Sequence, residues 1–297
     1  MSVKEIEHSL LLLRRQQLAP DSVRLDFAAP SLAAEAQAGQ FLEISCPGFL
    51  NRPFGIMDVS TDQGVVSIGV KTVGSNSRWL AGQHEGMEVK ALGPLGHGFD
   101  LKNCKRLLAV GGGSGIFPLF FAVRRALEAG ARVQWICGFR DEAQAFSHEN
   151  FAGLPAELFF SSDQGGLDFH GHAGVALEAL TRGESFDKSS LLIACGPLPL
   201  LRFARDFARE RQLSAQLSLE ERMACGLGLC LGCAVDLRDE KQGLKRLRCC
   251  KEGPVFSADD LVFPGDPQPV PGAYVKKGRM LWIFLFNVSD KNLKIPS

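Results

Sequence analysis

Two short segments near the carboxyl end of this chain hold five of its nine cysteines. The first reads ACGLGLCLGCAV over residues 224–235, and the second reads RCCKEGPVF over residues 248–256. Clustered cysteines are candidates for disulfides, for zinc and for iron–sulfur ligation. Because nine is an odd number, a closed set of disulfides is disfavoured.

The spacing of the first segment narrows the choice of metal. Cys225, Cys230 and Cys233 follow the pattern C-x4-C-x2-C, the spacing of plant-type [2Fe–2S] ligands. Zinc sites more often use two C-x2-C pairs, and this sequence has one. Glycines within the segment permit the curvature of a loop that wraps a cluster. The residues therefore favour iron–sulfur over zinc and leave Cys249 and Cys250 both open as the fourth ligand.

Composition restricts the class of the whole protein. A chain of 297 residues, 45% apolar and 22% charged, predicts a folded protein of two or three domains. Lys+Arg and Asp+Glu both total 33, which gives no support to nucleic acid or an anionic membrane as a partner. No apolar run reaches the roughly 18 residues of a membrane span, and the run at residues 10–13 is too short for a signal peptide. We expect a cytoplasmic protein, whose thiols are kept reduced.

The pattern of apolar residues predicts a barrel followed by an α/β domain. Residues 1–102 contain short runs such as VRLDFAAP and VVSIGVKTV, which are typical of strands in a small antiparallel barrel. In residues 103–215, strand-like runs such as RLLAVGGGSG alternate with helical patterns, which indicates a parallel sheet. Residues 216–263 are rich in glycine and cysteine and predict a small, loop-rich metal domain. The tail, 264–297, is assigned no role.

Three stretches are candidates for nucleotide binding. The glycine turn at residues 111–115 joins a strand to a helix and presents backbone N–H groups to a phosphate, but Ile116 breaks the G-x-G-x-x-G fingerprint. Cys195 ends a later strand, where parallel sheets bind ligands. Arg52, placed beside Pro53 between two strands, could bind a diphosphate bidentately. Each stretch also has a purely structural explanation. The glycines could form a tight turn, Cys195 could be a small buried residue, and Arg52 could be a surface arginine in a turn.

Taken in order, RPFG, VK followed by GSNSRWL, GPLGHGF, GGGSGIFPL and ACGP resemble the ferredoxin–NADP reductase superfamily over residues 5–215. That superfamily pairs an FAD-binding barrel with an NAD(P)-binding α/β domain. The resemblance implies FAD-binding residues, namely Arg52, Pro53, Phe54, Gly55, Gly69, Val70, Lys71, Asn76 and Ser77, the last two at the diphosphate. It implies residues at the NAD(P) site, namely Gly111, Gly112, Gly113, Ser114, Gly115, Gly196 and Pro197, with Cys195 as the catalytic candidate facing the nicotinamide.

Two positions depart from the pattern of that superfamily. Gly55 stands where Ser or Thr is usual, and it lacks the hydroxyl that would hydrogen-bond the flavin. Asn76 and Ser77 stand where Gly-Thr is usual, and Ser77 retains a hydroxyl.

A second resemblance covers residues 5–263. LEERMACGLGLCLGCAV followed by CKEGPVF is similar to the electron-transfer subunits of dihydroorotate dehydrogenase, which pair with an FMN-bearing catalytic subunit. In that family the fourth ligand directly precedes Lys-(Asp/Glu)-Gly-Pro-Val-Phe. This implies that Cys250 joins Cys225, Cys230 and Cys233 as a ligand, while Cys249 does not. It also implies electron transfer between the partner and NAD+ through [2Fe–2S] and FAD in pyrimidine biosynthesis, in a heterotetramer of two subunits of each kind.

The combination of sites is chemically coherent. A nicotinamide exchanges two electrons as a hydride, a [2Fe–2S] cluster takes one at a time, and a flavin can connect the two. The sequence contains no constellation that would oxidise a small substrate alone, which favours a subunit that depends on a partner. Two alternatives stay open. One is a related flavin/iron–sulfur subunit of the sulfide dehydrogenase or NADPH–ferredoxin transhydrogenase type. The other is a zinc-stabilised protein that binds a partner without electron transfer.

Overall fold

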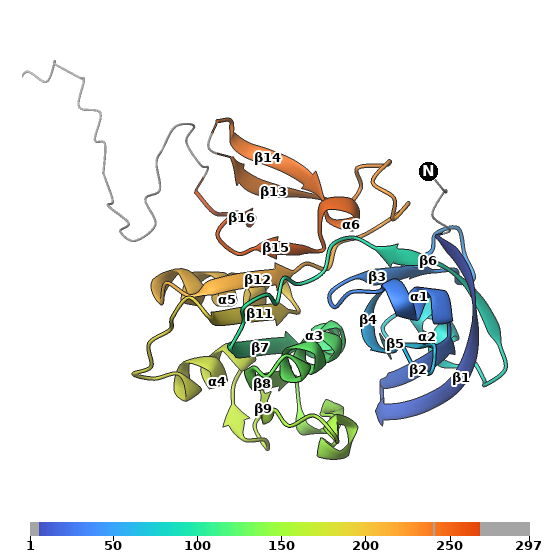
Figure 1. The fold of residues 1–297 in the computed structure, drawn as a ribbon, viewed down its shortest axis with the longest axis horizontal. Helices are drawn as coiled ribbons and strands as arrows, with labels where there is room; N and C mark the ends of the chain where they lie inside the picture. Colours follow the sequence, from blue (N-terminus) through green and yellow to red (C-terminus); the bar gives the residue numbers. More distant parts are fainter. Residues whose placement is uncertain (1–5, 240, 268–297) are drawn as a thin grey trace, which may run out of the picture.

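The computed structural model describes residues 6–239 and 241–267, and its first unit is a closed barrel (Figure 1). Six antiparallel strands close it in the order β1-β2-β5-β4-β3-β6. These strands are β1 (Glu7–Ala19), β2 (Ser22–Ala28), β3 (Phe41–Ile44), β4 (Arg52–Ser60), β5 (Val65–Lys71) and β6 (Glu88–Leu95). Two short helices, α1 (Pro30–Glu35) and α2 (Ser75–Ala81), accompany them. The predicted antiparallel barrel is confirmed. Arg52, which the sequence placed between two strands, is instead the first residue of β4.

The second unit is a seven-stranded sheet in the order β10-β9-β8-β7-β11-β12-β15. Its strands are β7 (Arg106–Gly112), β8 (Arg132–Phe139), β9 (Glu157–Ser162), β10 (Phe169–His170), β11 (Ser190–Cys195), β12 (Ser214–Ser218) and β15 (Val255–Ser257). All of them pair in parallel except β15, which runs antiparallel to β12. The predicted parallel sheet is therefore confirmed, with an antiparallel edge strand added.

Helices cover both faces of this sheet, as expected when strands and helices alternate. They are α3 (Phe117–Glu128), α4 (Ala173–Leu180) and α5 (Leu198–Glu210), with the 3-10 turns η1 (Gly113–Ile116), η2 (Glu142–Gln144) and η3 (His148–Phe151).

The third unit is more regular than its glycine-rich sequence suggests. It contains a hairpin of β13 (Ala234–Asp239) and β14 (Gly243–Arg248), the short strand β16 (Leu261–Val262) and one helical turn, α6 (Cys249–Glu252). Strand β15 leaves this unit and joins the sheet of the second, so the two are connected by main-chain hydrogen bonds. The domain boundaries proposed from the sequence stay predictions, and most of the tail, residues 268–297, lies outside the described residues.

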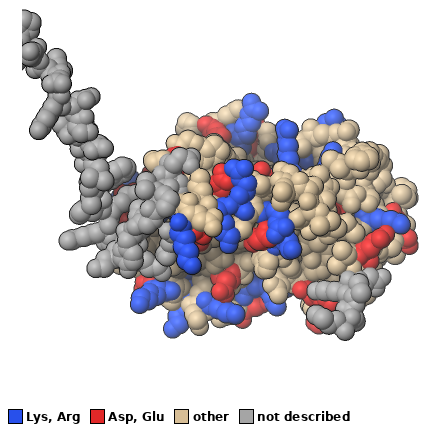
Figure 2. Space-filling view, turned by 90° about the horizontal axis from the view of Figure 1, so that it is seen from above, with Lys and Arg blue, Asp and Glu red and all other residues tan. Residues whose placement is uncertain are grey.

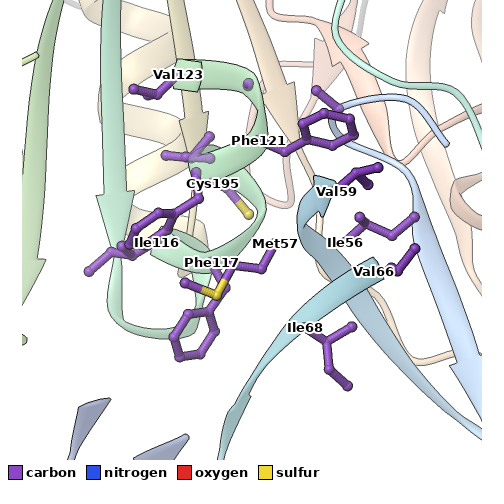
Figure 3. Packing of buried hydrophobic residues seen from close by; sticks show 14 of the residues in the cluster. Ile56, Met57, Val59, Val66, Ile68, Ile116, Phe117, Phe121, Val123 and Cys195 are labelled. Atoms are coloured by element: carbon purple, nitrogen blue, oxygen red, sulfur yellow. The ribbon is translucent and has the colours of Figure 1, made fainter. Parts of the chain in front are cut away.

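Helix α3 fixes the barrel against the sheet. Phe117 and Phe121 belong to one buried apolar cluster with Ile56 and Ile68 of the barrel (Figure 3). Each such side chain contributes about 1.5–3 kcal/mol when fully buried. At the edge of this contact, Arg124 of α3 forms an ion pair with Asp58 of β4. The packing holds the carboxyl ends of β7 and β11 beside the barrel.

The surface agrees with the balanced composition. Acidic and basic side chains lie interspersed on the face that Figure 2 shows. Across the described part of the chain, no helix is both long enough and apolar enough to span a membrane.

Candidate functional site

A cleft of about 430 Å³ opens where the barrel meets the carboxyl ends of β11 and β12. We call it the cofactor cleft. It brings together ten of the residues that the sequence singled out, namely Arg52, Pro53, Phe54, Gly55, Gly69, Lys71, Asn76, Ser77, Ser114 and Cys195. The other predicted nucleotide-site residues lie outside its lining, namely Val70, Gly111, Gly112, Gly113, Gly115, Gly196 and Pro197. Gly111 pairs with Cys195 in the sheet, so the glycine turn that begins at Gly111 lies next to the cleft, whereas Val70 is buried in β5.

On the barrel side, Arg52 and Asn76 form a polar pair. With its amide oxygen turned toward Arg52, Asn76 accepts hydrogen bonds from Nε at 3.0 Å and Nη2 at 3.2 Å. Its amide nitrogen then donates to the carbonyl of Pro47 at 2.6 Å. Ser77 uses its hydroxyl within the chain. Its Oγ accepts from the backbone N–H groups of Val73 and Gly74, both at 3.0 Å, and is therefore occupied by the turn that starts α2.

Two glycines of the barrel allow α3 to approach closely. A Cβ atom on Gly55 would lie 2.6 Å from Cγ of Pro118, and one on Gly69 would lie 2.1 Å from Cγ of Phe117. Contacts this short are not tolerated by real side chains. The missing hydroxyl at Gly55 therefore has a steric cause, because the start of α3 occupies the space of a side chain.

On the sheet side, Cys195 is buried at the end of β11. Burial raises the pKa of its thiol far above the usual range, and the nearby charge of Glu220 raises it further. The thiol is therefore neutral at physiological pH. Ser114 donates a hydrogen bond of 3.4 Å to Oε1 of Glu220, whose own pKa is raised by desolvation within the cleft.

On the sheet side of the cleft, sequence reasoning missed three polar lining residues, Ser218, Glu220 and Glu221. A signal for them was present. They stand at the end of a strand, β12, that is parallel to β11, and the ligand-binding edge of such a sheet collects the residues that follow each strand.

The second part of the site is the segment 225–233, which we call the cysteine loop. Its thiols and that of Cys250 interact in two pairs, Cys225 with Cys230 and Cys233 with Cys250. Backbone N–H groups point at the sulfurs, from Leu229 to Cys225 at 3.4 Å and from Cys250 to Cys233 at 3.4 Å. In residues 6–239 and 241–267, no three Cys, His, Asp or Glu side chains are arranged around a single metal ion. The thiols thus form pairs and not one tetrahedral group.

The environment of Cys225 favours the thiolate, whereas burial and the neighbouring Cys233 raise the pKa of Cys250 to about 12. Desolvation raises the pKa of Cys225, but backbone N–H groups, including those of Leu227 and Leu229, outweigh it and lower the pKa to about 6. Gly226 and Gly228 adopt positive φ angles of 64° and 79°, which glycine tolerates and which curve the loop around the sulfurs.

Cys249 faces away from this loop. Its thiol is fully buried and donates to the carbonyl of Leu219 at 3.6 Å, at the wall of the cofactor cleft. Burial raises its pKa well above the usual range. Its backbone N–H donates to the carbonyl of Cys233 at 2.9 Å. The two adjacent cysteines of the sequence therefore have different surroundings.

A buried carboxyl, which sequence reasoning also missed, lies against the cysteine loop. Glu43 of β3 is 1% exposed, and neither of its oxygens has a hydrogen-bond partner among the described residues. Burial raises its pKa to about 7, with the charge of Arg52 acting in the opposite direction. A Cβ atom on Gly226 would meet Cγ of Glu43 at 2.6 Å, so the loop packs directly on this side chain.

The barrel, the sheet and the added cysteine unit define a reductase of the ferredoxin reductase type that carries an iron–sulfur-binding domain. Residues 220–262 match the model of the iron–sulfur cluster binding domain of dihydroorotate dehydrogenase B. The chain is 33% identical over 260 residues to the dihydroorotate dehydrogenase B (NAD(+)), electron transfer subunit, of Shouchella clausii (strain KSM-K16), covering 85% of this chain and 97% of that relative. It therefore belongs to the family of dihydroorotate dehydrogenase B (NAD(+)) electron transfer subunits.

Further comparisons agree with this assignment. The corresponding subunit of Caldanaerobacter subterraneus subsp. tengcongensis (strain DSM 15242 / JCM 11007 / NBRC 100824 / MB4) is 34% identical over 227 residues, covering 76% of this chain and 87% of that relative. Among solved structures, an NADH-dependent reduced ferredoxin-NADP oxidoreductase studied for flavin-based electron bifurcation matches with a TM-score of 0.76. It is 25% identical and covers 88% of this chain and 91% of its own. The ferredoxin reductase in carbazole 1,9a-dioxygenase, with a TM-score of 0.62 and 16% identity over 72% of this chain and 68% of its own, shares the fold.

Proposed function

We propose that this chain passes electrons between an FMN-containing dihydroorotate dehydrogenase catalytic subunit and NAD+, with FAD and a [2Fe–2S] cluster as its bound groups. The main support for the proposal is that two pairs of thiols lie beside a cleft whose lining includes the residues expected to bind FAD. Together these groups supply conversion between two-electron and one-electron transfer. The chain's own residues bind them, exclude water and fix their surroundings.

The cysteine loop fits a [2Fe–2S] cluster. Such a cluster takes four thiolates over two irons, and two thiol pairs match that requirement. We assign the four ligands to Cys225, Cys230, Cys233 and Cys250. The N–H groups that point at the sulfurs are suited to stabilise thiolates. Cys249 is left out because its thiol faces the carbonyl of Leu219.

The cofactor cleft fits FAD. The guanidinium of Arg52 offers several donors to a diphosphate, and Asn76 holds that guanidinium in place. Pro53 and Phe54 supply an apolar wall, while Gly55 and the strand Gly69, Val70 and Lys71 supply backbone beside it. We assign the diphosphate to Arg52 and Asn76, with Ser77 shaping the turn.

The turn of Gly111, Gly112, Gly113, Ser114 and Gly115, together with Gly196 and Pro197, borders the place proposed for NAD. Cys195 remains a neutral thiol, so its proposed role is contact with the nicotinamide ring and not acid–base chemistry. Ser114 and Glu220 add a polar pair on the same wall.

The cysteine loop offers a surface for the partner. Leu229 and Leu231 are 79% and 64% exposed beside the exposed Cys230. Exposed apolar groups that gather on one loop are typical of protein contacts. We propose that the catalytic subunit docks here, in a heterotetramer of two subunits of each kind. The nine free cysteines fit a reducing, cytoplasmic environment.

A second candidate is a related reductase subunit that serves another partner, such as a sulfide dehydrogenase or an NADPH–ferredoxin transhydrogenase. Its support is the likeness to the ferredoxin-NADP oxidoreductase over 88% of this chain.

A visible spectrum and a metal analysis test the proposal first. Flavin bands with a broad [2Fe–2S] absorbance are expected, and a colourless protein with bound zinc would overturn both candidates. The chain is then co-purified with an FMN-containing catalytic subunit and assayed for NAD+-dependent dihydroorotate oxidation. An active pair with a mass of two subunits of each kind supports the first candidate, whereas a pair that reduces only ferredoxin or sulfur supports the second.

A further inference from the structure

We propose that Arg248 and Glu252 form a charged strut that positions the cysteine loop and sets the reduction potential of the cluster. This inference rests on the proposed cluster and names positioning residues that are not ligands. Arg248 is the last residue of β14, two positions before Cys250, and Glu252 ends α6 two positions after it. The pair therefore spans the helical turn that carries the proposed fourth ligand.

The contacts of Arg248 join both ligand-bearing segments. Its Nη1 donates to the carbonyl of Gly228 in the cysteine loop at 2.9 Å. Its Nε donates to Oε2 of Glu252 at 3.0 Å, and its Nη2 donates to Oε1 of the same carboxylate. The backbone N–H of Arg248 also donates to Oε2 of Glu252, at 2.8 Å. One guanidinium thus fastens the loop to the helical turn.

The residue that Arg248 fixes also contacts a ligand. The backbone of Gly228 interacts with the thiol of Cys250, while its carbonyl accepts from Arg248 at 2.9 Å; a Cβ atom on Gly228 would also lie 2.8 Å from Cδ of Lys251, the residue after Cys250. A change at Arg248 is therefore transmitted to the helical turn that carries the proposed fourth ligand. Such outer contacts orient the ligands of metal sites and tune their potentials.

The charge of Arg248 acts in a definite direction. Reduction adds one negative charge to the cluster, so a nearby positive charge stabilises the reduced form and raises the potential. Arg248 interacts electrostatically with both Cys233 and Cys250. Its side chain is 30% exposed and that of Glu252 is 24% exposed, so solvent screens the pair only in part. Glu252 partly cancels the effect of Arg248.

The same hairpin offers a matched control. Arg246 lies two residues earlier on β14 and forms a similar forked pair with Asp236, at 2.8 and 3.2 Å. Its side chain is 71% exposed, and its hydrogen bonds run across the hairpin and not to the cysteine loop. A charge change at this control pair should leave the cluster unaffected.

The test is a redox titration of the full chain, followed by the EPR signal of the reduced cluster, with iron content measured in parallel. Arg248→Gln is expected to shift the ratio of reduced to oxidised cluster about tenfold toward the oxidised form, which is a potential lower by about 59 mV for a one-electron couple. Arg248→Lys keeps the charge but cannot donate to both carboxylate oxygens of Glu252 as the guanidinium does, and its shift in potential should be smaller. Glu252→Gln should shift the potential upward, and Arg246→Gln should leave it unchanged.

These outcomes distinguish the role of the Arg248–Glu252 pair from the presence of the cluster. An unchanged potential in Arg248→Gln with full iron content overturns the proposal, as does an equal shift in Arg246→Gln. If Arg248→Gln loses its iron, Glu252→Gln decides, because it retains the bond from Arg248 to Gly228. An upward shift there supports the strut and an unchanged potential overturns it. Absence of iron and of an EPR signal in the unaltered chain would overturn the proposed function and this inference together.

Discussion

The cysteine loop and the wall of the cofactor cleft place thiols close together in opposite environments. Backbone N–H groups lower the pKa of Cys225 to about 6 against the effect of desolvation. Burial raises the pKa values of Cys195 and Cys249, and Cys249 faces a carbonyl oxygen. N–H groups favour a thiolate, whereas apolar surroundings favour a neutral thiol. Burial and Cys233 also raise the pKa of Cys250, to about 12, so the pKa alone does not separate Cys250 from Cys249; what differs is the contact, since Cys250 interacts with Cys233 and Cys249 faces a carbonyl oxygen.

The largest expected effect tests this contrast between adjacent cysteines. Cys250→Ser should lose most of the iron, because one of four proposed thiolates is removed and its partner Cys233 is left unpaired. Cys249→Ser should keep the iron, because that side chain faces Leu219. Iron content and the visible spectrum of the two variants are the measurements. Loss of iron in Cys249→Ser alone would reverse the assignment.

A second prediction concerns Glu43, which lies between the two regions. Its pKa of about 7 in the folded protein exceeds the ordinary value of 4.5, so the folded state binds the proton more tightly than the unfolded state. Stability is therefore unaffected below pH 4.5, falls as the pH rises toward 7 and stays reduced above it. The full difference is about 3 kcal/mol.

Glu43→Gln imitates the protonated carboxyl and should remove this penalty. The variant should be more stable than the parent at pH 8 by up to about 3 kcal/mol and nearly equal to it at pH 4.5. Unfolding of both proteins is followed across this pH range, with the exposed Glu149→Gln as the control. A constant difference in stability at every pH would show that Glu43 does not titrate on folding.

A third prediction separates the cleft from the loop. Arg52→Ala removes charge-assisted hydrogen bonds worth about 1.5–3 kcal/mol and should weaken FAD binding roughly tenfold to a hundredfold. Its iron content should stay unchanged. Arg78→Ala is the matched control, because Arg78 is exposed on α2, two residues after Asn76, and does not line the cleft. Flavin content and affinity are measured, and full flavin occupancy in Arg52→Ala would argue against the proposed diphosphate site.

The sequence predicted the parts of the molecule that depend on local pattern. Short apolar runs with glycine and proline between them predicted the barrel, and alternation of strands with helices predicted the parallel sheet. It did not predict that β15 returns to pair with β12, because a three-residue strand carries little pattern and its partner lies far away in the chain. The hairpin of β13 and β14 was missed for another reason: β13 alternates apolar with charged residues, but its partner β14 does not.

The site residues also divide into those that a local motif reveals and those that only the fold reveals. Motifs located Arg52, Asn76 and Cys195, which line one cleft. Glu43 stands inside an ordinary barrel strand, and only the packing of the cysteine loop on that strand gives it a special environment. Such contacts between distant segments leave no local signal in a single sequence.

The smallest expected effect concerns Gly55, where sequence comparison and packing gave different expectations. A serine is usual in the superfamily, yet its Cβ would lie 2.6 Å from Pro118 here. Gly55→Ser should therefore destabilise the contact of α3 with the barrel by about 1–3 kcal/mol. Gly74→Ser is the control, since a Cβ there meets nothing within 4 Å. Thermal unfolding is the measurement, and Pro118→Ala added to Gly55→Ser should restore part of the loss. If Gly55→Ser alone is as stable as the parent and binds FAD more tightly, α3 must move to make room for the side chain. The packing beside the cleft would then be less rigid than the 2.6 Å contact indicates.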